Sequence, residues 1–207
     1  MGEHLKFAGQ PDRVQRDALE AIVRSSPLLM EVLRGLRNEN LPETLLVAGA
    51  IYNLVWNRLT GRDDVRGIND IDVFYFDARD TSYEAEDVVI RRLEQRFSHL
   101  PLPVQVRNQA RVHLWFPQKF GMPFAPLTSS AEMLGRYAST THAVGVRLEA
   151  DDTLTIVAPF GLDDIFSFRI VPNRVLRNQP AHEAKAARAK SLWPELTVLP
   201  WEEGRTS

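Results

Sequence analysis

The sequence contains no cysteine, so disulfide bonds, zinc–thiolate centres and thiol catalysis are excluded. It also lacks any apolar run long enough to cross a bilayer. Residues 1–6 are not followed by the apolar stretch of a secretory signal. Together these absences predict a cytoplasmic protein with no membrane partner.

A large excess of either charge is missing as well. The 25 Lys and Arg residues nearly balance the 27 Asp and Glu residues, which gives a formal net charge of -2. Such a chain has no general attraction for nucleic acid or anionic membranes, so a polyanion would have to meet a local basic patch. Repeats and low-complexity tracts are absent too, and the length of 207 residues predicts a single domain over residues 1–207.

Apolar periodicity predicts a mixture of helices and strands along this domain. Helical spacing predicts helices over residues 11–25, 27–37, about 50–59 and 83–98, and a basic, alanine-rich composition predicts one more over 181–192. Apolar runs and alternation predict strands over 44–48, 70–76, 104–116 (with a bend near Asn108) and 168–171, and a hairpin within 144–156. This order indicates an α/β or α+β fold with a mixed sheet flanked by helices: a helical part (1–42), a core (43–171), and a C-terminal helix and tail (172–207).

The strongest chemical signal is an Asp-x-Asp motif inside an otherwise apolar stretch, residues 69–76. Alternate residues of a strand face the same side, so Asp70 and Asp72 are expected to project together. Burying two carboxylates side by side is costly unless a cation neutralises them. The pair is therefore a candidate catalytic divalent-metal site, with a loop cap or a surface salt bridge as the alternative.

A strand–glycine–helix unit precedes this motif. Gly49 and Ala50 follow an apolar strand and open a helix, and the N–H groups at such a helix start bind phosphate well. Taken alone, a glycine that follows a strand is usually just a turn. Beside Asp-x-Asp, however, the unit can bring a triphosphate and a pair of Mg²⁺ ions together, because Mg²⁺ prefers carboxylate and phosphate oxygens.

Two segments resemble the nucleotidyltransferase signature of the polymerase-β superfamily: residues 47–53 (Val-Ala-Gly-Ala-Ile-Tyr-Asn) and 69–73 (Asn-Asp-Ile-Asp-Val). They are most similar to the head domain of CCA-adding enzymes and poly(A) polymerases. The whole chain resembles a bacterial family of small stand-alone nucleotidyltransferases. The segments that carry this wider resemblance are residues 108–115, 158–164 and 193–194.

The resemblance implies a polymerase-β-type core with an additional C-terminal hairpin and helix. It also implies Mg²⁺, or Mn²⁺ in its place, held by Asp70 and Asp72, and a nucleoside triphosphate at Gly49, Ala50 and Asn53. The implied reaction moves a nucleoside monophosphate to an acceptor hydroxyl and releases pyrophosphate. RNA, a small molecule and a protein all stay open as the acceptor, as do the preferred base and the oligomeric state.

The chain departs from the superfamily pattern in three places. Gly49-Ala50 stands where Gly-Ser or Gly-Gly is usual, and Tyr52 and Asn53 stand where CCA-type turns have arginine and aspartate. The slot for a third acid holds Gln105, and an amide cannot act as a base. Either another acid serves, or general-base catalysis is absent and the protein is a catalytically impaired nucleotide-binding module. The other acids that we consider are Glu149 and Asp163.

Cations provide the remaining candidates. Arg107 and Arg111 alternate with apolar residues on the predicted strand 104–116. Their guanidinium groups are suited to bind a triphosphate. The alternative is that they form a solvated basic face. His113 and Trp115 share that face as packing, phosphate-contacting or base-stacking residues. The basic run on the last predicted helix is interpreted as solvated, with contact to a polyanionic acceptor as the alternative; its members are Lys185, Arg188 and Lys190.

Overall fold

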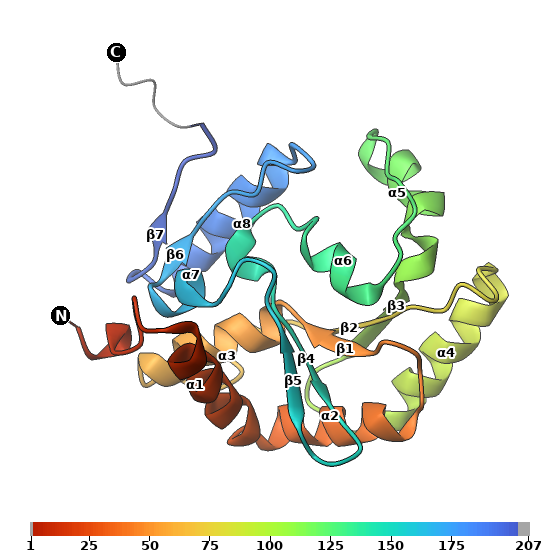
Figure 1. Ribbon diagram of the computed structural model, residues 1–207, viewed down its shortest axis with the longest axis horizontal. Coiled ribbons are helices and arrows are strands. Elements are labelled where there is room, and N and C mark those ends of the chain that lie inside the picture. The colour runs from red at the N-terminus through yellow and green to blue at the C-terminus, as the bar shows by residue number, and fades with distance from the viewer. Residues whose placement is uncertain (1, 203–207) are drawn as a thin grey trace.

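The computed structural model describes residues 2–202 and is built on a five-stranded sheet of order β3-β2-β1-β4-β5 (Figure 1). The strands are β1 (Leu45–Val47), β2 (Ile71–Tyr75), β3 (Val104–Asn108), β4 (Gly145–Leu148) and β5 (Leu154–Val157). The β2–β3 pair is parallel and the other pairs are antiparallel. The predicted mixed sheet with flanking helices is therefore confirmed.

Helices lie on both sides of the sheet. In Figure 1 one side carries α1 (Asp12–Arg24), α2 (Pro27–Asn38) and α4 (Tyr83–Arg96), and the other carries α5 (Val112–Phe120), α6 (Ser130–Leu134) and α8 (Gln179–Leu192). The remaining elements are α3 (Gly49–Leu59), α7 (Asp163–Phe166), the short parallel pair β6 (Arg169–Ile170) and β7 (Thr197–Val198), and the 3₁₀ turns Glu3–Leu5, Gln109–Arg111 and Thr140–His142. Within residues 2–202, no helix combines the length and the apolar character that crossing a membrane requires.

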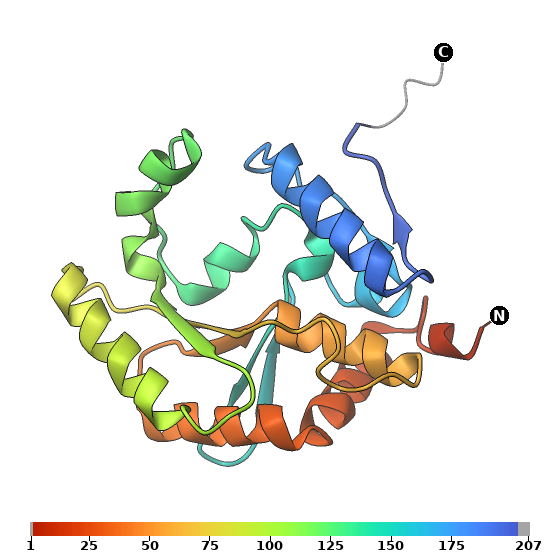
Figure 2. The same cartoon turned by 180° about the vertical axis from the view of Figure 1, so that it is seen from behind.

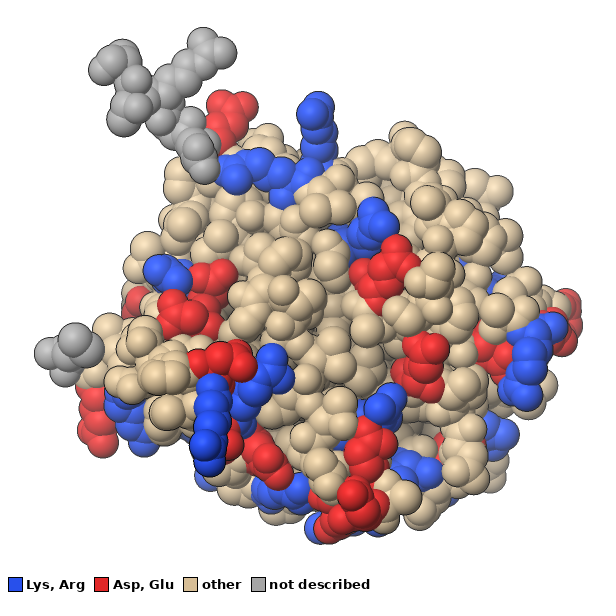
Figure 3. Space-filling view, in the orientation of Figure 1, with Lys and Arg blue, Asp and Glu red and all other residues tan. Residues whose placement is uncertain are grey.

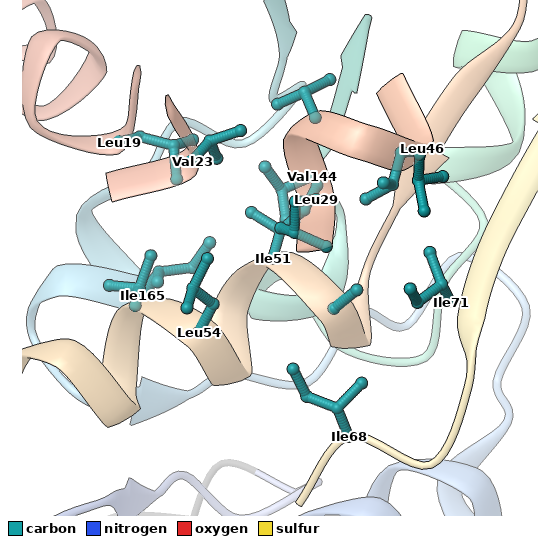
Figure 4. Close-up of a cluster of buried hydrophobic side chains, with 14 of the residues drawn as sticks. Leu19, Val23, Leu29, Leu46, Ile51, Leu54, Ile68, Ile71, Val144 and Ile165 are labelled. Atoms are coloured by element: carbon teal, nitrogen blue, oxygen red, sulfur yellow. The ribbon is translucent and has the colours of Figure 1, made fainter. Parts of the chain in front are cut away.

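The main hydrophobic core lies between the sheet and helices α1–α4. Leu46 of β1 and Ile71 of β2 meet Leu29 of α2 and Ile51 of α3, and each of these side chains is at most 2% exposed (Figure 4). Burying such a side chain contributes about 1.5–3 kcal/mol. The helices that were predicted from apolar spacing start and end within two residues of the predicted bounds, because the same apolar spacing that predicts them buries their inner face.

The register of the sheet decides which residues lie on its second face, the one that points away from the main core. Val47 of β1 lies opposite Asp72 of β2, and Asp72 lies opposite Gln105 of β3. Residues opposite one another in paired strands point to the same side. Asp72 and Gln105 therefore project from the face that carries α6 and α8, away from the main core.

The predicted strand over residues 104–116 is half correct. The bend near Asn108 is confirmed, but the strand ends there and the chain continues as a 3₁₀ turn and then as α5. The Asn108 side chain caps the turn by accepting a hydrogen bond from the Ala110 N–H at 3.1 Å. Val112 and Phe116, four residues apart, share a small apolar cluster with Phe124, so their spacing matches a helix as well as a strand.

The backbone is strained at the junction between β1 and α3. Ala48 has φ 55° and ψ -117°, a combination that side-chain-bearing residues rarely adopt. Its N–H donates to the Val144 carbonyl at 2.8 Å, and its carbonyl accepts from the N–H groups of Ile51 and Tyr52. The strained turn thus lies at Ala48-Gly49, one residue before the predicted Gly49-Ala50.

Replacing Ala48 with glycine is expected to raise the free energy of unfolding by about 1 kcal/mol. Relief of the strained conformation is worth roughly 1–3 kcal/mol, and the added freedom of glycine in the unfolded chain removes part of it. Ala50→Gly is the control, because Ala50 has ordinary helical geometry and the change there lowers stability by about 1 kcal/mol. Urea denaturation of both variants checks the difference, and equal losses would contradict the strain at Ala48.

Candidate active site

A pocket of about 270 Å³ opens beside the β1–α3 junction, on the second face of the sheet. Its walls come from the start of α3, the loop ahead of β2, β2 itself and one face of α8. We call it the site pocket, and the lining residues that matter most are Gly49, Asn53, Asp70, Asp72, Lys185 and Arg188.

The two predicted acids lie together in this pocket. Asp72 projects from β2, and Asp70 lies just before the strand, where its Oδ2 accepts a hydrogen bond of 2.8 Å from the Gln105 amide. Burial, and then the negative charge of Asp70, raises the pKa of Asp72 to about 6, against the influence of Lys185 and Arg107. At neutral pH the pair therefore carries negative charge that the surrounding protein does not fully compensate.

This donor set fits a hard divalent cation that takes some of its ligands from the protein and the others from a phosphate. Nowhere in residues 2–202 do three or more His, Cys, Asp or Glu side chains converge as a metal site. The pocket offers two carboxylates instead. Mg²⁺ commonly takes one or two carboxylates and completes its octahedron with water and substrate phosphate oxygens. The residues present match that pattern better than an all-protein cage.

Gly49 leaves space on the pocket side of α3. A Cβ placed on Gly49 would lie 3.8 Å from the Asn53 Nδ2 and from the Tyr52 Oη, which is ordinary contact. The fold therefore tolerates a side chain here, but that side chain would occupy the pocket. Ala50 differs, because it is 1% exposed and packs into the main core rather than lining the pocket. Only the backbone of Ala50 remains available to a ligand.

Asn53 lies on the same wall as Gly49, one turn further along α3. Its Nδ2 donates to the Gly67 carbonyl at 3.3 Å, which ties α3 to the loop ahead of β2. Gly67 itself has φ +73°, and a Cβ there would lie only 2.4 Å from the Trp193 ring. Glycine is therefore required at this point for the loop and α8 to pack closely.

Helix α8 brings two cations to the carboxylates, although the sequence favoured a solvated basic run. Lys185 and Arg188 are three residues apart and share one helical face, and Arg188 donates to the Gly67 carbonyl at 3.0 Å and to the Asn69 Oδ1 at 2.9 Å. The sequence signal that was missed is the alignment of Ala189 and Trp193 with this face. Figure 2 shows α8 lying over α3.

Trp193 anchors this arrangement at the end of α8. Its side chain is 1% exposed, and its Nε1 donates to the Asn57 Oδ1 of α3 at 3.0 Å. Its ring meets the ring of Trp56 with centroids 5.3 Å apart. Lys190 agrees better with the solvated interpretation, because it is exposed and does not line the site pocket. Its ammonium group donates to the carbonyls of Pro194 and Leu196, in the segment that follows α8.

The two predicted arginines are separated by the end of β3. Arg107 stays on the exposed face of the strand with Gln105, close enough to Asp72 to lower its pKa, but it does not line the site pocket. Arg111 is turned away from the pocket. Its guanidinium pairs with Glu86 of α4 and donates to the Thr81 carbonyl at 2.8 Å, so it holds α4 against the turn after β3.

The alternative third acids lie elsewhere. Glu149 follows the far end of β4 and binds Arg147 and Thr155. Asp163 binds the Gly9 N–H at 2.7 Å and the Gln15 side chain at 2.9 Å. Neither lines the site pocket, so neither supplies the missing acid. His113 and Trp115 lie on α5 rather than on the strand face predicted for them.

The other titratable side chains around the pocket are held neutral. Tyr52 stacks on His142 with centroids 4.7 Å apart, and burial raises the Tyr52 pKa far above its usual range. Burial, and then Lys185 and His182, lowers the pKa of His142 to about 3. Burial, and then Asp72 and Tyr52, also raises the pKa of Tyr137. None of these groups is suited to exchange a proton at neutral pH.

The fold is that of a nucleotidyltransferase head domain. A family model described as nucleotidyltransferase matches residues 34–198, and the chain belongs to this family. No curated protein matches the sequence.

Among solved structures, the chain is similar to an NMR structure described as a CCA-adding enzyme head domain, with 26% identity and a TM-score of 0.71 over 89% of this chain and 95% of that one. It shares its fold with the Thermotoga maritima CCA-adding enzyme in complex with tRNA (16% identity, TM-score 0.55). It also shares the fold of a CCA-adding enzyme in complex with ATP (17% identity, TM-score 0.52). The match to the Thermotoga protein spans 90% of this chain but only 42% of that protein.

Asp72→Asn is expected to stabilise the protein without ligands by about 1–3 kcal/mol at pH 7, because it removes the repulsion between the two carboxylates and the cost of burying a charge. Chemical denaturation in the presence of a chelator measures this gain.

Asp77→Asn is the matched control. The pKa of Asp77 is lowered by its hydrogen bonds to Arg79, so neutralising Asp77 removes a favourable contact and gives no gain. A loss of stability in Asp72→Asn equal to that in Asp77→Asn would show that the Asp72 charge is already compensated.

Proposed function

We propose that this protein is a Mg²⁺-dependent nucleotidyltransferase, with Mn²⁺ as an alternative metal. It would move a nucleoside monophosphate group from a nucleoside triphosphate to an acceptor hydroxyl and release pyrophosphate. The observation that carries the proposal is the meeting of Asp70 and Asp72 with Gly49 and the α8 cations in one pocket, in a chain of the nucleotidyltransferase family.

The carboxylates are the proposed metal ligands. Asp70 and Asp72 offer two hard oxygen donors on one side of β2, with uncompensated charge. A bound Mg²⁺ would neutralise phosphate charge and align the reacting phosphate. The protein's own contribution is rigidity, because β2 is held between β1 and β3 and the donors are fixed before substrate arrives.

The triphosphate is proposed to lie between α3 and α8. The first N–H groups of a helix lack partners within the helix and attract anions, and the absent side chain at Gly49 lets a phosphate approach them. Lys185 and Arg188 supply positive charge from the opposite wall. Arg188 is also held in place by the loop before β2, which limits the entropy lost on binding.

Nucleotide binding without turnover is the second candidate. Gln105 favours it, since this amide lies beside Asp72 in the sheet where a third acid is expected, and it cannot remove the proton of an acceptor hydroxyl. Positioning and electrostatics nevertheless provide most of the acceleration in phosphoryl transfer. We therefore retain transfer as the leading proposal.

The acceptor is proposed only as a hydroxyl-bearing molecule. One structural relative is described in complex with tRNA, but it shares 16% identity and is more than twice as long as the matched part. On the face seen in Figure 3, acidic and basic side chains are interspersed rather than gathered in a basic surface. A small molecule or a protein side chain therefore remains as suitable an acceptor as RNA.

The first test of the proposal is to measure the thermal stability of the protein with each of ATP, GTP, CTP and UTP, in the presence and absence of Mg²⁺. A ligand that binds the native state raises the apparent stability, by about 2.7 kcal/mol at a hundredfold excess over its Kd. Incubation with α-labelled nucleotides and RNA, metabolite or protein fractions then reveals transfer. Asp72→Asn should abolish both responses, and labelling that persists at full strength in this variant would refute the assignment.

Lys185→Gln is expected to weaken binding of the magnesium complex of a non-hydrolysable ATP analogue by about ten- to a hundredfold, since a charge-assisted contact contributes about 1.5–3 kcal/mol. Calorimetric titration measures the change. Arg13→Gln removes the same charge from an exposed position on α1 that does not line the pocket, and it should leave the affinity unchanged. Equal effects of the two substitutions would indicate a general charge effect rather than a contact in the pocket.

A further inference from the structure

Gln105 does not itself line the site pocket, but it lies opposite Asp72 on β3 and contacts Asp70. In the sheet, Asp72 has two direct neighbours, Val47 on β1 and Gln105 on β3. Val47 is fully buried and apolar, so it offers no ligand. Of these two neighbours, only Gln105 is in register to place an oxygen or nitrogen on the side of Asp72, and its exposed side chain does reach that region.

The Gln105 amide acts on Asp70 as a donor. Its Nε2 lies 2.8 Å from the Asp70 Oδ2, so one carboxylate oxygen already accepts a hydrogen bond from the protein. A metal ion and an N–H group compete for the lone pairs of the same oxygen. A neutral amide also adds no negative charge, which a second divalent ion placed close to the first would need.

The charges around the pocket also favour a single divalent ion. Two carboxylates balance one divalent ion, and Lys185 and Arg188 line the same pocket while Arg107 lies close enough to influence Asp72. A second divalent ion about 3.5–4 Å from the first would bring two more positive charges into a region that already holds cations. A second ion would also compete with Lys185 and Arg188 for the oxygens of the substrate phosphates.

We propose that Gln105 limits the site pocket to one divalent cation, bound together with the nucleotide. Lys185 and Arg188 of α8 then neutralise part of the phosphate charge that a second ion would otherwise neutralise. This inference rests on the proposed function, because it assumes that Asp70 and Asp72 hold a metal beside a triphosphate. Gln105 is thus a residue that sets metal stoichiometry. Its replacement by glutamate supplies a third carboxylate of nearly identical shape.

Mn²⁺ with a non-hydrolysable α,β-methylene ATP analogue tests the stoichiometry without turnover. Electron paramagnetic resonance, with the free-ion signal subtracted, is expected to report one bound Mn²⁺ per wild-type chain and no coupling between metals. Gln105→Glu should bind two Mn²⁺ ions with the spin coupling of a pair about 3.5–4 Å apart.

Gln95→Glu on α4 is the matched control, since it makes the same exchange at an exposed position outside the pocket, and it should keep one ion. Gln105→Leu removes the donor without adding a ligand and should also keep one ion.

Two coupled ions on the wild-type protein, or two on Gln105→Leu, would overturn the inference while leaving the proposed function intact. One ion on a folded Gln105→Glu would overturn it as well. Failure of the wild-type protein to bind the metal–nucleotide pair would refute the proposed function, and the inference with it. Should Gln105→Glu not fold, the wild-type count alone decides between one ion and two.

Discussion

The repulsion between two carboxylates on one side of β2 is the constraint around which this site is built. Asp72 is partly withdrawn from water and lies beside Asp70, and its raised pKa records the cost. The surrounding protein offsets this cost only in part, through Lys185 and Arg107 and through the amide that binds Asp70. Such a retained cost is typical of functional sites, and the proposed binding of a cation with a phosphate would relieve it.

Helix α8 shows how a distant part of the chain completes the site. It approaches the β1–α3 junction because Gly67 has no side chain to collide with Trp193, and because Trp193 docks on Asn57 and Trp56. Arg188 then joins the helix to the loop that carries Asp70. The same contacts that pack the C-terminal segment therefore also place its positive charge beside the acids.

The likeness to CCA-adding enzymes concerns the head region, since this chain covers less than half of the Thermotoga protein but 95% of the chain described as a head domain. Within that region the strand–turn–helix unit lies beside the acidic pair. Ala48 bears the strain of the turn, and Gln105 occupies the position opposite Asp72 on β3.

Apolar periodicity was enough to predict the main helices, the central strands and the expectation that Asp70 and Asp72 face the same way, because periods of 2 and 3.6 residues report which side chains are buried. It was not enough to predict that the chain turns into α5 after Asn108, since Val112 and Phe116 suit either period. Nor did it distinguish Arg111, which is paired with Glu86, from Lys185, which lines the pocket. Contacts between residues far apart in the chain depend on packing, so the cations that lie near the acids became known from the folded arrangement of α8 against α3 and the loop before β2.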